Sequence, residues 1–123
     1  MRKQYYFRPS ERGLLSWDVD RLILLSGGLE PKRIPLSQIK ELNSIWTGDS
    51  DRPTWNEFIQ HVALVHAADL SYPIILSATG EVMDGMHRVA KAVLEGRADI
   101  AGVQFNVDPE PDHIGLRPED LPY

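Results

Sequence analysis

The sequence predicts an α+β domain in which a small mixed β-sheet is packed with helices. Two helix patterns, at 54–68 and 86–95, flank a short apolar hairpin at 73–83, and alternating apolar residues at 100–107 predict a last strand. The chain has 123 residues, which is the size of one ordinary domain with one hydrophobic core. We therefore interpret residues 1–123 as a single domain.

The weaker signals lie in the first half of the chain. Ser16 is a suitable N-cap for a short helix over 16–25. A proline-containing stretch at 32–36 predicts a short or edge strand, and residues 37–42 predict a helical segment. Residues 43–53 have the composition of a loop.

The second half of the chain has clearer signals for helix starts and turns. Thr54 and Glu57 have the spacing of a capping box, which opens the strongest helix of the chain. The hairpin is expected to turn at Thr79-Gly80. The helix over 86–95 is expected to bury one apolar face, which consists of Val89, Ala90, Val93 and Leu94.

Composition excludes several classes of protein. Apolar residues make up 42% and charged residues 25% of the chain, as in globular proteins. Cysteine is absent, which removes disulfides, thiolate metal ligands and cysteine nucleophiles. A formal charge of −5 argues against a surface that binds nucleic acid on all sides, and no apolar run is long enough for a transmembrane segment. We expect a cytoplasmic protein with no membrane contact.

Charge is divided unevenly along the chain. Residues 1–40 carry eight basic and four acidic residues, whereas residues 41–123 carry five and fourteen. The basic N-terminal arm, residues 1–15, interleaves aromatic residues with its cations, which would suit a phosphate-bearing partner. We favour a simpler interpretation, in which the arm and the acidic, proline-rich tail, residues 108–123, are surface segments that attract each other. The arm has too few cations to dominate counterion release from a nucleic acid.

The stretch DGMHRVAK, from Asp84 to Lys91, is where the sequence predicts chemistry. A strand ends at Asp84, the chain turns at Gly85, and a helix begins at once. The free N–H groups and the dipole of a helix start favour an anion, and glycine permits a positive φ there. His87 and Arg88 stand in the first turn, where acidic residues are normally preferred. Such a conflict with a local rule is typical of a functional site.

Two interpretations of these bases are equally weighted. In the first, a phosphate lies between them, with Arg88 as a fork donor, His87 as a second donor or acid/base, and Lys91 on the same face. In the second, Arg88 pairs with Asp84 and His87 only packs. Asp84 is correspondingly either an N-cap carboxylate or a base or metal-bridging group beside a nucleotide.

The string DGMHRVAKAVLEG, preceded by PIILSATGEVM, resembles the ParB/sulfiredoxin superfamily, and the order of the elements from RIPLSQI onward is similar over residues 31–107. The resemblance implies a ParB/sulfiredoxin-like core at 31–107. It also implies a loop that binds the phosphates of ATP, ADP or CTP, for which we expect Mg²⁺ as the companion ion. Carried over by position, this loop consists of Gly85, Met86, His87 and Arg88.

The sequence also departs from the family patterns. Met86 stands where sulfiredoxins have their reactive cysteine, so sulfinic-acid reduction by that route is excluded. Partition proteins have a G-E-R-R-x-R-A pattern followed by a DNA-reading domain, and neither is found in this sequence. The chain is more similar to stand-alone ParB-like proteins, a group that includes ADP-using archaeal free-serine kinases. That similarity implies phosphoryl transfer with a catalytic acid outside the loop, for which Glu30 and Glu41 are candidates.

We therefore hypothesise a nucleotide-phosphate-binding domain that transfers a phosphoryl group or hydrolyses a nucleotide, with Asp84 and His87 in catalytic roles. The alternative is a non-enzymatic adaptor or DNA-associated regulator that uses the nucleotide as a switch or has lost it. We rank a nuclease last, because the sequence shows no cluster of acidic residues with a lysine that could hold two metal ions. The expected partners are a nucleotide and a small-molecule or protein acceptor, with DNA not as sole partner. A homodimer is compatible with the sequence.

Two further groups of residues were weighed. His61 and His66 are five residues apart, so they share no helix face well, and we expect them to be surface or helix-supporting residues and not zinc ligands. Asp49, Asp51 and Arg52 lie in the predicted loop, with Trp46 before them and Trp55 after them. They suit a base-stacking rim, although packing at the edge of the core is the commoner role for such tryptophans.

Overall fold

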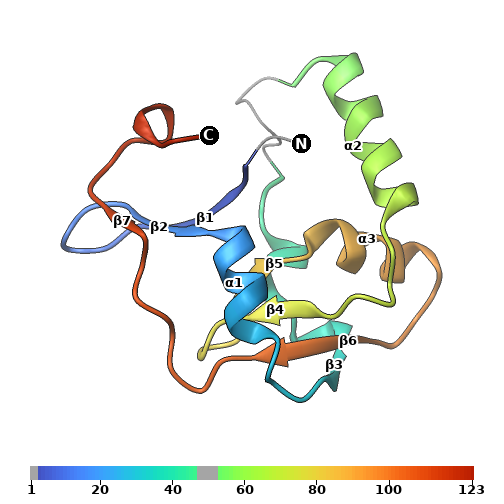
Figure 1. Cartoon of the computed structure of the whole chain (residues 1–123). Helices are drawn as coiled ribbons and strands as arrows, with labels where there is room; N and C mark the ends of the chain where they lie inside the picture. Colours follow the sequence, from blue (N-terminus) through green and yellow to red (C-terminus); the bar gives the residue numbers. More distant parts are fainter. Residues whose placement is uncertain (1–2, 47–52) are drawn as a thin grey trace.

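Residues 3–46 and 53–123 are described by the computed structural model, and the predicted loop at 43–53 lies largely outside them. This part of the chain forms three α-helices and two small sheets (Figure 1). The helices are α1 (Val19–Ser26), α2 (Trp55–Ala67) and α3 (Met86–Leu94). One sheet has the order β1-β2-β7, and its strands are β1 (Tyr5–Arg8), β2 (Leu15–Asp18) and β7 (His113–Ile114). The other has the order β3-β6-β4-β5, and its strands are β3 (Lys32–Pro35), β4 (Ile74–Leu76), β5 (Val82–Asp84) and β6 (Asp99–Gln104).

The larger sheet is mixed, which agrees with the predicted α+β class. Strand β4 runs parallel to β6, whereas β3 with β6 and β4 with β5 are antiparallel pairs. The β4–β5 pair is the predicted hairpin, and its turn closes through a hydrogen bond from the Gly80 N–H to the Ser77 carbonyl at 3.0 Å. The polypeptide between β3 and α2 forms two short 3₁₀ turns, Leu36–Gln38 and Lys40–Asn43, in place of the single helical segment predicted there.

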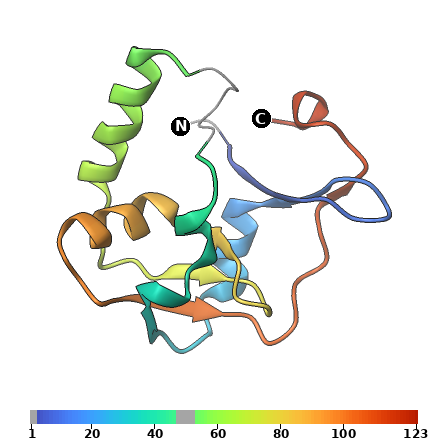
Figure 2. The ribbon, with the colours of Figure 1, turned by 180° about the vertical axis from the view of Figure 1, so that it is seen from behind.

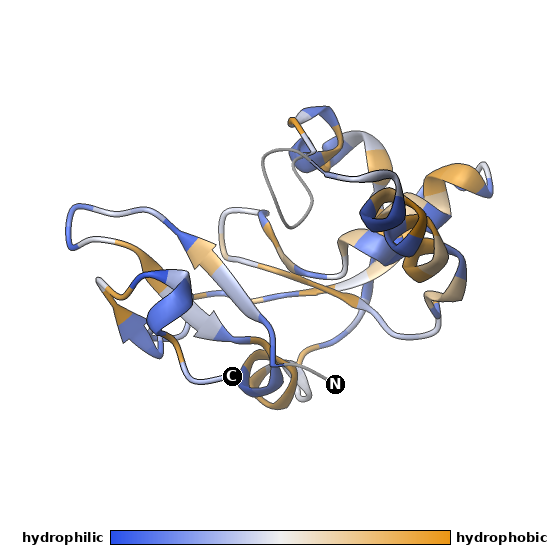
Figure 3. Ribbon diagram, turned by 90° about the horizontal axis from the view of Figure 1, so that it is seen from above, coloured by the Kyte–Doolittle hydropathy of each residue, from blue (hydrophilic) through white to orange (hydrophobic). Residues whose placement is uncertain are grey.

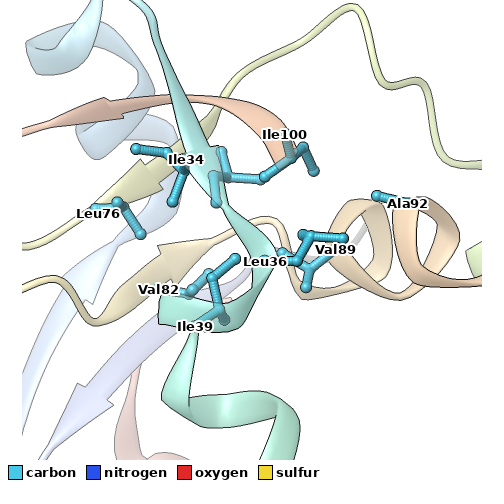
Figure 4. Close-up of a cluster of buried hydrophobic side chains, with 9 residues drawn as sticks. Ile34, Leu36, Ile39, Leu76, Val82, Val89, Ala92 and Ile100 are labelled. Atoms are coloured by element: carbon cyan, nitrogen blue, oxygen red, sulfur yellow. The ribbon is translucent and has the colours of Figure 1, made fainter. Parts of the chain in front are cut away.

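The two faces of this sheet are covered by different elements. On one face, β-strand residues pack against α3 and the first 3₁₀ turn, as the close-up of the buried side chains shows (Figure 4). On the other face, Ile75, Met83, Val103 and Phe105 pack against Trp17 of β2 and Leu22 of α1. Full burial of a side chain of this kind contributes roughly 1.5–3 kcal/mol. Strands β4 and β5 therefore contribute side chains to the hydrophobic clusters on both faces of the sheet. This packing holds in place the strand that ends at Asp84.

The start of the chain differs most from the prediction. Residues 15–18 form strand β2, not the first turn of a helix, and Ser16 is completely buried in that strand. Helix α1 begins three residues later with Asp18 as its N-cap, whose carboxylate accepts from the Asp20 N–H. The helix prediction for 16–18 is wrong because Leu15 and Trp17 alternate toward the core as β residues do, and pairing with β1 outweighs the capping tendency of Ser16.

The basic arm and the acidic tail meet in the smaller sheet. Strand β2 pairs with β1 on one side and with β7 of the tail on the other. The Arg8 guanidinium lies 2.9 Å from the Asp108 carboxylate and 4.9 Å from the centroid of the Trp17 ring. Arg21, which belongs to α1 and not to the arm, also pairs with Asp112 of the tail at 3.2 Å. The expected attraction between the two segments is thus present, and both lend strands to the fold. The tail also forms a short 3₁₀ turn at Pro118–Asp120, inside the predicted turn.

Helices α2 and α3 begin where the sequence predicts, whereas the buried face of α3 differs from the prediction. Thr54 caps α2, and its hydroxyl accepts from the Glu57 N–H at 3.2 Å, as the capping box predicts. In α3 the buried residues are Val89 and Ala92, whereas Val93 is 44% and Leu94 is 69% exposed. Strand β6 ends at Gln104, three residues before the predicted end of the last strand. Figure 3 shows apolar and hydrophilic residues alternating around the helices.

Helices α2 and α3 lie on one side of the molecule and the smaller sheet on the other, as the views from front and back show (Figures 1 and 2). Within residues 3–46 and 53–123, no helix combines the length and the apolar character needed to cross a bilayer.

Candidate functional site

Gly85 forms a sharp junction between β5 and α3. Its φ is +119°, in the left-handed region that side chains other than glycine rarely adopt. A Cβ atom built at this position would lie 2.6 Å from Cγ2 of Ile74, a completely buried residue of the adjacent strand. Both the backbone conformation and the close approach require glycine, so the predicted turn is confirmed.

The N-cap of α3 is Gly85, which has no side chain that could cap the first turn. The Val89 N–H donates to the Gly85 carbonyl at 3.0 Å, so the N–H groups of residues 86–88 come before the first intrahelical bond. No acidic residue stands in this first turn. The positive end of the helix dipole is therefore not balanced by a carboxylate of the turn itself.

Arg88 is held by three acceptors. Its Nη2 donates to Oδ2 of Asp84 at 2.9 Å, and its Nη1 donates to the carbonyls of Tyr72 and Pro73 at 2.9 and 2.7 Å. Both side chains of the ion pair are largely buried, at 15% exposure for Arg88 and 20% for Asp84. The pairing that the sequence left as one of two interpretations is thus formed. It ties the start of α3 to the segment that enters β4.

His87 has a neighbour that the sequence did not indicate. Its Nε2 lies 3.3 Å from Nδ1 of His61 on α2, and the two ring centroids are 4.9 Å apart. The centroid of the Trp46 ring lies 4.8 Å from that of the His61 ring. A direct contact between two imidazole nitrogens requires that one of them presents its lone pair. No spacing rule connects residues 26 positions apart on two helices, so the contact follows only from tertiary packing.

Lys91 points to the end of α2. Its Nζ donates to the His66 carbonyl at 3.0 Å and to the Ala68 carbonyl at 2.6 Å. These carbonyls belong to the last turn and C-cap of α2, where a cation satisfies unpaired acceptors and the negative end of the dipole. Lys91 thus fastens α2 to α3, a role that the spacing from Arg88 did not predict.

Glu30 and Glu41, the candidates for a catalytic acid outside the loop, lie in different parts of the fold. Oε2 of Glu41, in the second 3₁₀ turn, accepts from the Val82 N–H at 2.7 Å, which brings Glu41 against the edge strand that leads to Asp84. Glu30 is exposed in the connection between α1 and β3. Of the two candidates, Glu41 is the one joined to the β5 backbone.

The best-defined groove in the described part of the chain does not lie at the start of α3. A groove of about 430 Å³ runs between the end of α2 and the second half of α3, and its charged lining residues are Asp69, Lys91, Glu95 and Arg97. Two cations and two acids give this groove no excess of either sign. Among the residues that the structure describes, no three His, Asp or Glu side chains are grouped to hold a metal ion.

Comparisons with models of protein families, with curated proteins and with solved structures found no match to this chain. Interpretation of the site therefore depends on its residues and geometry.

Proposed function

We propose that the start of α3 binds the phosphate group of a nucleotide such as ATP, ADP or CTP. One observation carries the proposal: the helix begins at a left-handed glycine, which offers no capping side chain of its own, and no acid stands in its first turn. The N–H groups of such a turn and its dipole attract an anion, and phosphate offers acceptor oxygens in several directions. The sequence resemblance to ParB/sulfiredoxin-like proteins supports a nucleotide as the phosphate donor.

In this proposal the backbone makes the main contacts. The amides from Met86 to Arg88 donate to the phosphate, and His87 adds a ring N–H from the same turn. Arg88 contributes its charge and holds the turn in place, because both terminal nitrogens already donate to Asp84 and to backbone carbonyls. Lys91, engaged with α2, adds positive potential from farther along α3.

The proposed chemistry is phosphoryl transfer or nucleotide hydrolysis. Asp84 directly precedes Gly85 and is the proposed base, with His87 as an acid/base partner. One oxygen of Asp84 accepts from Arg88, so a second oxygen is left for a substrate hydroxyl or water. Mg²⁺ would be held mainly by the nucleotide, with Asp84 as its protein carboxylate, and would supply neutralisation of phosphate charge.

The test compares two substitutions of His87 that have nearly the same shape and differ in charge. Calorimetric titration with ATP, ADP and CTP in the presence of Mg²⁺ is compared with the corresponding nucleosides. The variants are His87→Glu and His87→Gln, which both remove the contact with His61 and differ from each other only in charge. A carboxylate in the first turn of a helix favours the helix by about 0.3–1 kcal/mol, so loss of binding in His87→Glu cannot be attributed to a melted helix.

We expect nucleotides to bind and nucleosides to bind far more weakly. A carboxylate about 5 Å from a phosphate charge costs roughly 1–3 kcal/mol at an intermediate dielectric constant, so His87→Glu should bind at least about fivefold more weakly than His87→Gln. Equal affinities of the two variants, or no binding of any nucleotide to the wild-type chain, would contradict the proposal. Assay of released inorganic phosphate or ADP then separates an enzyme from a nucleotide-dependent switch.

A further inference from the structure

Helix α2 is poorly covered by the rest of the chain. Of its 13 residues, Val65 alone is buried. Trp55 is 80% exposed, Ile59 is 58% exposed and Phe58 is 44% exposed. Front and back views both place α2 at the outer edge of the molecule, beside α3 (Figures 1 and 2). Most helical stability in proteins comes from tertiary packing of an apolar face, and this helix leaves much of that face in solvent.

Five apolar residues, four of them exposed and Val62 half-buried, form one surface. Trp55, Ile59 and Val62 are separated by four and three residues, which puts them on one face of a helix, and Phe58 lies beside them. Ring contacts make the surface continuous: Phe58 lies 6.1 Å from Trp55 and 6.2 Å from Trp46, which is 44% exposed. We call these five residues the α2 stripe.

We infer that the α2 stripe is the interface of a homodimer, in which two α2 helices pack antiparallel. The stripe carries no charged side chain, so two chains that each have a net charge of −5 meet at a surface without like-charge contacts. Antiparallel packing also sets opposite ends of the two helix dipoles side by side.

The sequence of α2 is complementary to itself in this orientation. When Ile59 lies opposite Val62 of the other copy, each large side chain faces a smaller or flatter one. The facing pairs are Ile59 with Val62, Phe58 with Ala63, and Trp55 with His66. Each pair occurs twice across the twofold axis, as a closed symmetric interface requires.

The available area is enough for a stable dimer. Given the exposed fractions above and about 150–250 Å² for an aromatic side chain, the stripe offers roughly 450 Å² of apolar surface per copy. Two copies then bury about 900 Å² of apolar area, and with the usual share of polar rim the interface reaches about 1,500 Å² in total. Stable interfaces bury about 1,200–2,000 Å².

The oligomeric state tests this inference. Light scattering coupled to size-exclusion chromatography, over a wide range of concentrations, should give the mass of a dimer for the full chain. Ile59→Glu should be a monomer at every concentration. The matched control is Leu64→Glu, because Leu64 is 55% exposed on the same helix but about 140° round it from Ile59. The control should remain a dimer, and circular dichroism of both variants checks that the helix is intact.

Cysteine crosslinking tests the register, since the chain has no cysteine of its own. A mixture of Ile59→Cys and Val62→Cys chains should form a disulfide-linked heterodimer under mild oxidation, whereas Ile59→Cys alone should crosslink poorly. Efficient crosslinking of Ile59→Cys with itself would overturn the register that sets Ile59 opposite Val62. A wild-type chain that stays monomeric at all concentrations, or an equal loss of dimer in Ile59→Glu and Leu64→Glu, would overturn the interface and leave the stripe to a different partner.

Discussion

Replacement of Gly85 by alanine should destabilise the protein through two separable effects. The first is backbone strain, because an L-residue in the left-handed region costs roughly 1–2 kcal/mol. The second is steric: the new Cβ would lie 2.6 Å from Cγ2 and 2.9 Å from Cβ of Ile74, which is completely buried and has no room to move. Overpacking of a well-filled core typically costs about 1–3 kcal/mol.

Gly80 provides the control that isolates the steric effect. Its φ is +89°, so it carries a comparable strain, but a Cβ there would have no heavy atom within 4 Å. Alanine also restricts the unfolded chain, which offsets about 0.4–1 kcal/mol of the strain in both variants. We therefore expect a loss of about 1 kcal/mol for Gly80→Ala and about 2–4 kcal/mol for Gly85→Ala.

Urea unfolding followed by circular dichroism gives both free energies of unfolding. The result that supports the argument is a Gly85→Ala loss larger than the Gly80→Ala loss by about 1–3 kcal/mol, with unchanged dependence on urea. Equal losses in the two variants would refute the claim that close packing against Ile74 fixes this junction.

Two further predictions concern side chains that join distant segments. Lys91→Met removes the cation at the C-terminus of α2 and should lower the free energy of unfolding by about 1–2 kcal/mol, whereas Lys32→Met, which removes one exposed bond to Gln104, should change it by less than half as much in the same urea assay. Burial and then the hydrogen bond to Glu81 raise the pKa of Tyr6 to about 12. Because the folded pKa is raised, this group's stabilisation is complete below the ordinary tyrosine pKa and is lost as the pH rises toward 12. Absorbance titration of tyrosinate should contain a late step near pH 12 that Tyr6→Phe lacks, and an unchanged curve would contradict the assigned burial. The same hydrogen bond is the main reason that the pKa of Glu81 is lowered, so its stabilisation is present above the ordinary glutamate pKa and is lost on acidification.

The parts of the fold that the sequence predicted well are those set by local rules. The Thr54 cap, the turn at Gly80 and the junction at Gly85 depend on residues within a few positions of one another, and all three are present. The strand at 15–18 was missed because its conformation depends on pairing with β1 and β7, which lie at opposite ends of the chain. Long-range pairing outweighs a local capping preference at Ser16.

The site shows the same division. The anion-attracting geometry of the turn followed from a glycine before a helix, since each condition is local. The contact of His87 with His61 and the contact of Lys91 with the end of α2 depend on how the two helices pack, and no sequence spacing encodes them. Sequence reasoning could therefore name the residues of the turn and offer Asp84 as a partner of Arg88, but it could not name the partners of His87 and Lys91.

These partners change which groups can recognise a phosphate. A basic residue in the first turn of a helix is locally unfavourable, and the sequence suggested that an external anion compensates for it. Asp84 and two backbone carbonyls already compensate for Arg88, and two carbonyls of α2 compensate for Lys91. The conflict at Arg88 is thus resolved within the chain, whereas Gly85, the N-cap of α3, offers no side chain to the amides of residues 86–88. In the proposed function, recognition of a phosphate at this turn therefore comes first from the backbone, so a charge change at His87, and not truncation of Arg88, is the test.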